Sequence, residues 1–107
     1  MRVEFHPEAT SEFRSAALWY DERQAGLGDS FVATVTELLA RIESAPGAFP
    51  TWPGAISARS VIRKATLSRF PYLIAFEHYP DHVLVLGVAH QKRRPLYWLR
   101  RAKGRTE

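Results

Sequence analysis

The residues of this sequence that are best suited to chemistry lie together near its C-terminus. An apolar run without any charge, residues 83–89, leads into a histidine, and three cations, a proline and two aromatic residues follow before residue 99. Cations at this density are costly to bury, and an arginine fork binds phosphate or carboxylate through two parallel hydrogen bonds. The sequence therefore predicts a basic surface patch formed by His90, Lys92, Arg93, Arg94, Tyr97 and Trp98.

This patch holds residue types that ribonuclease chemistry requires. Cleavage through the RNA 2′-hydroxyl needs a base for the hydroxyl proton, cations for the charge on phosphorus, and an acid for the leaving oxygen. His90 is the candidate acid or base, and Tyr97 is suited to stack on a nucleobase or to position the phosphate. The candidate cations are Arg63, Lys64, Arg69, Arg93 and Arg94. Alternation along a strand places Arg63 and Lys64 on opposite faces, so only one of them can join a site on the sheet.

Structural roles compete with these functional ones. A histidine at the end of a buried strand is more often a hydrogen-bonded structural residue than a catalyst. Tyr97 and Trp98 are also suited to closing the core with their polar atoms at the surface. His78 and His82 flank a turn but lack a third ligand, so we expect no metal there.

Hydrophobic periodicity predicts the first elements that position these residues. Alternation over residues 2–6 predicts a short strand, and Pro7 is suited to the first position of a helix. Apolar side chains then recur at helical spacing over residues 9–20 and again over 31–42. In the turn between them, Gly26 is suited to a left-handed cap, and Asp29 or Ser30 to an N-cap. Two amphipathic helices with so short a connection should form an antiparallel hairpin.

The second half of the chain predicts strands. Residues 58–64 alternate, and residues 69–79 and 82–90 are joined by a Pro-Asp turn, which indicates a hairpin. The run 83–89 is apolar on both parities, as in a central strand whose free edge can pair with the N-terminal strand. We expect residues 44–54, rich in proline and glycine, to form a loop, and Pro95 to begin a short helix. The predicted fold is α+β in the order β-α-α-β-β-β, an antiparallel-rich four-stranded sheet with the helical hairpin on one face.

Length and composition describe one globular domain. The chain has 107 residues, 46% hydrophobic and 24% charged, and no cysteine, which excludes disulfides and thiolate metal sites. We expect a single domain over residues 1–107, with a core of about 2–101 and a frayed tail at 102–107. The first twenty residues carry three glutamates and lack an apolar segment, which argues against a signal peptide. We expect a cytoplasmic protein with no membrane partner and no cofactor.

Charge is distributed unevenly along the chain. The net charge is +4, but residues 1–43 hold four basic against eight acidic side chains, and residues 44–107 hold eleven against three. The cations fall on the predicted sheet half instead of being scattered. This pattern favours a basic face that meets a polyanion or an acidic protein over a merely solvated surface.

The order of elements and three motifs resemble a known family. The motifs are GLGDSF at residues 26–31, RFPYLIAF at 69–76 and LGVAHQKRRPLYWLRR at 86–101. Together they are similar to the RelE/ParE superfamily of bacterial toxins from type II toxin–antitoxin modules of the plasmid-stabilising type. The resemblance covers roughly residues 3–101. It implies a small growth-inhibiting toxin that is neutralised by a co-encoded antitoxin, whose helix and strand wrap around it.

This superfamily divides into two activities. RelE-like members cleave mRNA in the ribosomal A site, whereas ParE-like members poison DNA gyrase and need no general acid or base. RelE-like enzymes carry an arginine directly after the tyrosine that matches Tyr72, and this chain has Leu73 there. Arg93, four residues before Tyr97, does match a catalytic arginine of those enzymes. The GLG junction and the C-terminal motif look more ParE-like, so we favour gyrase poisoning over mRNA cleavage.

The two activities assign the candidate residues differently. If the chain is RelE-like, the catalytic residues are His90, Arg93, Lys64 and Tyr97. The predicted contacts with the target or with nucleic acid are Arg63, Arg69, Lys92, Arg94 and Trp98. A third hypothesis, a non-toxic nucleic-acid-binding module, uses the same basic half but has no recognisable RNA-binding or zinc-finger signature to support it.

Overall fold

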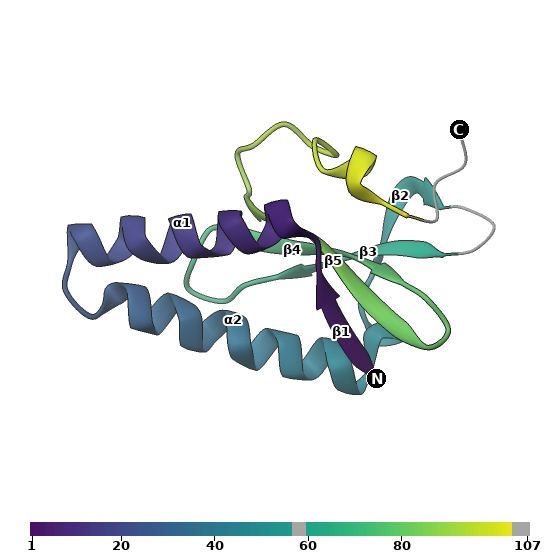
Figure 1. Cartoon of the computed structure of the whole chain (residues 1–107), viewed down its shortest axis with the longest axis horizontal. Helices are drawn as coiled ribbons and strands as arrows, with labels where there is room; N and C mark the ends of the chain where they lie inside the picture. The colour runs from purple at the N-terminus through teal and green to yellow at the C-terminus, as the bar shows by residue number, and fades with distance from the viewer. Residues whose placement is uncertain (57–59, 104–107) are drawn as a thin grey trace.

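The computed structural model describes residues 1–56 and 60–103, arranged as two helices and five strands (Figure 1). The helices are α1 (Pro7–Arg23) and α2 (Leu27–Ser44), with short 3₁₀ helices η1 (Pro46–Ala48) and η2 (Leu99–Arg101). The strands are β1 (Arg2–Phe5), β2 (Thr51–Ile56), β3 (Val61–Thr66), β4 (Tyr72–His78) and β5 (His82–His90). No helix in the described residues is both long and apolar enough to cross a membrane.

The strands form one mixed sheet in the order β1-β5-β4-β3-β2. β1 runs parallel to β5, and the other neighbours are antiparallel. This arrangement confirms the predicted α+β class, the helical hairpin, and the pairing of the N-terminal strand with the free edge of the apolar strand. β5 lies between β1 and β4, and its residues from Val83 to Ala89 are all buried, as their continuous apolar character predicts.

The sheet has one strand more than we expected. β2 lies in the segment predicted to be a loop, where Pro53 interrupts the sequence. Proline lacks the N–H that a central strand must donate, but it is tolerated on an edge, and β2 is the outermost strand next to β3. The β2–β3 register is irregular, since Thr51 pairs with Arg63 whereas Ile56 pairs with Val61.

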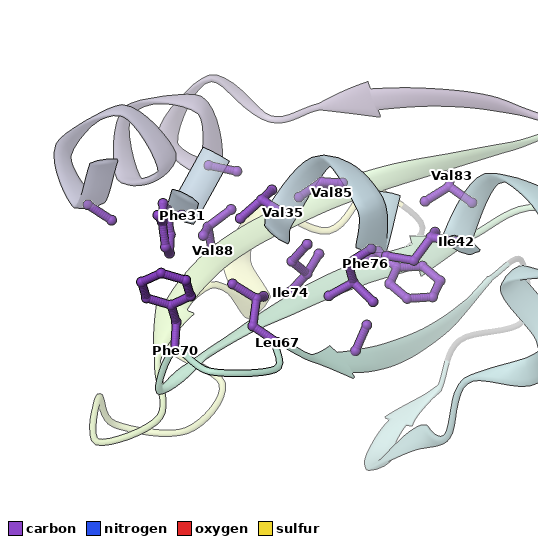
Figure 2. Close-up of a cluster of buried hydrophobic side chains, with 14 residues drawn as sticks. Phe31, Val35, Ile42, Leu67, Phe70, Ile74, Phe76, Val83, Val85 and Val88 are labelled. Atoms are coloured by element: carbon purple, nitrogen blue, oxygen red, sulfur yellow. The ribbon is translucent and has the colours of Figure 1, made fainter. Parts of the chain in front are cut away.

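The helical hairpin covers one face of the sheet and forms the larger core (Figure 2). Phe31 is fully buried, and its ring lies 5.3 Å from those of Tyr20 and Phe70 and 5.2 Å from that of Tyr72. Burial of one such aromatic side chain stabilises the fold by roughly 1.5–3 kcal/mol. Both predicted apolar stripes face this core: Ala9, Phe13, Ala16, Ala17 and Tyr20 from α1, and Phe31, Val35, Leu38, Leu39 and Ile42 from α2.

The C-terminal segment, residues 96–103, covers the opposite face of the sheet. Trp98 is only 1% exposed and packs on Gly87, where an added Cβ would lie 3.2 Å from the indole Cδ1. Its ring meets the Trp52 ring edge-on at 5.1 Å, which joins β2 to this second core. The helix predicted to begin at Pro95 begins instead at Leu99, after a left-handed residue at Leu96 (φ 64°).

The predicted frayed tail is partly fixed. The N–H of Lys103 donates to Oε1 of the buried Glu77 over 3.0 Å, and the Ser60 hydroxyl donates to the other carboxylate oxygen over 2.7 Å. The last four residues of that predicted tail, 104–107, lie outside the described residues, as do residues 58 and 59 of the strand predicted over 58–64. The backbone of residue 103, within the predicted tail, is thus hydrogen-bonded to β4.

The junction between the helices depends on two glycines. Gly26 has the predicted left-handed conformation (φ 89°), but the N-cap predicted at Asp29 or Ser30 is wrong because α2 already begins at Leu27. The carboxylate of Asp21, at the end of α1, instead accepts a hydrogen bond from the Gly26 N–H over 2.9 Å. It reaches across the turn, so no side chain within α2 itself is needed as the cap.

At Gly28 the second helix lies directly against the first. A Cβ at this position would lie 2.5 Å from the Ala17 carbonyl oxygen and 2.8 Å from the Asp21 Cβ. Neither atom belongs to the flexible end of a side chain, so the helices would have to separate. The second glycine of the GLG motif is thus explained by the packing of the hairpin.

Replacing Gly28 with alanine should therefore destabilise the fold. We expect Gly28→Ala to lower the free energy of unfolding by roughly 1–3 kcal/mol, as overpacking does, measured by urea denaturation. Gly26→Asn is the matched control, since nothing lies within 4 Å of its Cβ position and asparagine tolerates left-handed backbone. Equal stability of Gly28→Ala and the wild type would contradict this account of the junction.

Arg63 links β3 to the end of β4 and to the segment before β2. Its Nε donates to Nδ1 of His78 over 3.1 Å, and its Nη1 donates to the Phe49 carbonyl over 2.8 Å. Burial, and secondarily the Arg63 charge, lower the pKa of His78. Both effects favour a neutral His78 in the folded chain, and a neutral imidazole can accept the Arg63 hydrogen bond at Nδ1.

The stability of the fold should therefore depend on the protonation of His78. Because its pKa is lowered on folding, the stability it contributes is present above the unfolded value of about 6.5 and is lost as the pH falls below it. We expect the urea midpoint of the wild type to drop between pH 7.5 and 5.5 more than that of His78→Asn, which keeps an acceptor but does not titrate. Parallel curves for the two proteins would remove His78 as the cause.

Candidate functional site

The chain turns sharply where β5 ends. Residues 91–95, here called the basic loop, begin with Gln91, whose N–H donates to the Pro71 carbonyl over 2.8 Å. The imidazole Nδ1 of His90 accepts a hydrogen bond from the Lys92 N–H over 3.1 Å. The backbone carbonyl of His90 accepts one from the Arg93 N–H over 2.9 Å. The His90 ring also meets the Tyr72 ring edge-on at 5.2 Å. His90 thus fixes the start of the loop.

The basic loop presents its cations to solvent. The side chains of Lys92, Arg93 and Arg94 are all exposed. Within the described part of the chain, none of the three forms an ion pair. Their charges are therefore available to an anionic group outside this chain.

A groove of about 550 Å³ runs between α1 and the basic loop. From α1 it is lined by Ser11, Ser15 and Trp19, and on the other side by Tyr72, His90 and Arg93. The Trp19 side chain is 47% exposed, and the Arg23 guanidinium covers its ring at 3.8 Å from the centroid. A larger hollow, about 650 Å³, lies at the C-terminal end of α2 and reaches only Lys64 among the predicted site residues.

Tyr97 connects the basic loop to α1. The Arg93 guanidinium lies 4.0 Å from the centre of the Tyr97 ring, a cation–π distance. The Tyr97 hydroxyl donates to Oε2 of Glu12 over 2.7 Å. Burial, followed by the hydrogen bond to Glu12, raises the pKa of Tyr97 far above its usual range. The phenol is therefore neutral, and its O–H donates a hydrogen bond to the Glu12 carboxylate.

Glu12 is the central residue of this region, and the sequence analysis missed it. Its Oε1 accepts the backbone N–H of Val88 over 3.0 Å and Arg101 Nη1 over 3.1 Å. Its Oε2 accepts Arg101 Nη2 over 3.1 Å, in addition to the Tyr97 hydroxyl. A signal was present, because Glu12 lies three residues after Ala9 on the apolar face of α1. An acid on that face needs a buried partner.

Arg101 is that partner. Its side chain is only 4% exposed, and its Nη1 also donates to the Leu86 carbonyl over 2.8 Å. The neighbouring Arg100 forms a second, solvent-exposed ion pair with Glu8, one turn earlier on α1. Both arginines thus attach the C-terminal segment to the first helix. Figure 1 shows the short C-terminal helix, in yellow, on the side of the molecule where α1 begins.

The remaining predicted site residues lie elsewhere. Lys64 points to the second face of the sheet, with its Nζ 5.3 Å from the Trp52 ring, whereas Arg63 is bound to Phe49 and His78 on the helical side. The opposite orientation predicted for these two residues is therefore observed. Arg69, in the left-handed conformation (φ 69°), lies near the basic loop but donates to the Thr34 hydroxyl on α2 over 3.1 Å.

Trp98 is not available for contact with another molecule. We predicted it as a contact residue, but its side chain is buried between the sheet and the C-terminal segment. The structure therefore brings together five of the predicted residues, and the set consists of His90, Lys92, Arg93, Arg94 and Tyr97. This surface offers exposed cations beside a groove with aromatic walls, an arrangement suited to binding anionic groups.

Comparisons with known proteins agree with the fold and the motifs. The family model described as the ParE toxin of the type II toxin–antitoxin system parDE matches residues 3–95. A solved structure titled as the chromosomal ParDE toxin–antitoxin system from P. aeruginosa superposes with a TM-score of 0.60 at 13% sequence identity. The match covers 84% of this chain and 95% of that one, and it shows a shared fold. No sequence among the curated proteins matches significantly. Because the family model spans most of the chain, this protein belongs to the ParE toxin family of type II toxin–antitoxin systems.

Proposed function

We propose that this toxin arrests growth by binding DNA gyrase through the basic loop and the adjoining groove, and that a cognate antitoxin neutralises it. Membership of the ParE toxin family implies a cognate antitoxin as a partner. The choice of gyrase over the ribosome rests on the geometry of the candidate residues. The target would present carboxylates, or the phosphates of gyrase-bound DNA, to the exposed Lys92, Arg93 and Arg94.

The observation that supports this proposal is the separation of Lys64 from the other groups that RNA cleavage would require. His90 packs with Tyr72 on the helical side of the sheet, whereas Lys64 lies over Trp52 on the opposite side. The Tyr97 hydroxyl is bound to Glu12, so it is not free to transfer a proton to a substrate. A catalyst needs its acid, base and cations at one reacting atom. A binding surface needs only exposed groups in a fixed frame, and the basic loop provides these.

Reversing the charge of the basic loop should abolish toxicity. We expect Arg93→Glu combined with Arg94→Glu to remove growth inhibition, because like charges would then face the anionic groups of the target. Arg2→Glu combined with Arg14→Glu is the matched control, since both arginines are exposed and lie outside the basic loop and groove. Growth after induction is the readout, with circular dichroism to check folding. A folded, fully toxic Arg93/Arg94 variant would overturn the proposed surface.

The target is identified in the same cultures. After induction, plasmid DNA is examined for trapped gyrase–DNA breaks, and a translated mRNA is examined by primer extension. We expect gyrase-dependent breaks with intact mRNA, and co-expression of the antitoxin should remove them. Cuts within codons of the mRNA would instead identify a RelE-like endoribonuclease.

A further inference from the structure

We infer that Glu12 is a positioning residue: acting through Tyr97, it holds the basic loop in the orientation that meets the target. The biological readout of this inference rests on the proposed function. The structural part does not, because it concerns only contacts within the chain. Tyr97 and Arg101, which bind Glu12, both lie beyond the residues 3–95 that match the family model.

The Glu12 carboxylate holds three separate parts of the chain at once. It accepts a backbone N–H from β5, the hydroxyl of Tyr97, two residues after the basic loop, and a guanidinium from η2. All four hydrogen bonds are between 2.7 and 3.1 Å, and Glu12 itself sits on a regular turn of α1. Hydrogen bonds to an ionised acceptor are the stronger kind. The position of Tyr97 is therefore set by α1.

The basic loop is held at both ends. At its start, His90 and Pro71 bind the first backbone N–H groups; at its end, the Tyr97 hydroxyl is bound by Glu12. Between Arg94 and Tyr97, Leu96 adopts the left-handed conformation, which costs a leucine on the order of 1–3 kcal/mol. Such a conformation persists only when the surrounding contacts hold it. Fixing Tyr97 is one of those contacts.

Arg93 depends directly on this anchor. Its guanidinium stacks on the Tyr97 ring at 4.0 Å from the ring centre, and its backbone N–H donates to the His90 carbonyl. If the Tyr97 hydroxyl lost its bond to Glu12, the Arg93 guanidinium would lose the fixed ring on which it stacks. The orientation of the principal cation of the loop is thus transmitted from Glu12 without any contact between Glu12 and the target.

Tyr97→Phe separates this role from general stability. The substitution removes the hydroxyl that Glu12 binds but keeps the ring beneath Arg93, and it leaves the bonds of Glu12 to Arg101 and Val88 in place. Glu12→Gln is the second variant, which weakens all the bonds together. Glu8→Gln is the matched control: it lies one turn earlier on α1 and changes the exposed ion pair with Arg100 and the longer, 3.6 Å contact with Arg101, but no bond of Tyr97.

Two readouts are measured on the purified, folded full chain and in induced cultures. Backbone ¹⁵N relaxation should show lower order parameters at residues 92–94 and at Leu96 in Tyr97→Phe and Glu12→Gln, with the strands unchanged. Growth inhibition should need roughly tenfold more toxin, the change expected on losing one hydrogen bond to a charged group. Glu8→Gln should match the wild type in both.

The outcomes separate the inference from the proposed function. Unchanged order parameters in Tyr97→Phe would overturn the inference, whatever the toxicity. A loosened loop with full toxicity would overturn the positioning role, although the anchor would stand. If the Arg93/Arg94 charge reversal remains toxic while Tyr97→Phe loosens the loop, it is the proposed contact surface that fails.

Discussion

The arrangement of this toxin depends on how the edge of β5 is closed. β1 pairs with β5 only as far as Val85, and the His6 N–H donates to the Val85 carbonyl, so the strand beyond this point has no neighbour on that side. Unpaired backbone groups are costly when buried. Here the Glu12 carboxylate accepts the Val88 N–H and the Arg101 guanidinium donates to the Leu86 carbonyl, so that an ion pair takes the place of a strand.

This closure of the β5 edge determines the path of the C-terminal segment. Arg101 can reach the β5 edge only if the C-terminal segment returns across the sheet, and in doing so the segment lays Trp98 over Leu86 and Ala89 on the second face. Removing one member of a buried ion pair costs about 3–5 kcal/mol, since the other charge is left without a partner. The Glu12 carboxylate, which closes the β5 edge together with Arg101, therefore also fixes the end of the basic loop through Tyr97.

Sequence patterns predicted most of the fold but only part of the site. The apolar stripes of both helices and the continuous apolar run of β5 report local burial, and each was interpreted correctly. β2 was missed because a proline within a short segment argues against a strand. This proline is tolerated only because β2 lies at the edge of the sheet. Trp98 was assigned to the surface because its burial depends on Gly87, eleven residues away. Glu12 was missed because its partners are distant in sequence, with Arg101 separated from it by 89 residues.

The two faces of the sheet are the reason that we propose binding over catalysis. Strand alternation sends Lys64 to one face and keeps His90 on the other, and β4 separates their strands. No change of rotamer brings such groups to one atom, so the spacing along the sheet itself opposes a shared catalytic centre. The cations of the basic loop are under no such constraint, because they are adjacent in sequence and all exposed. The contact surface that we propose therefore lies beyond the sheet, in a loop that Glu12 of α1 anchors through Tyr97.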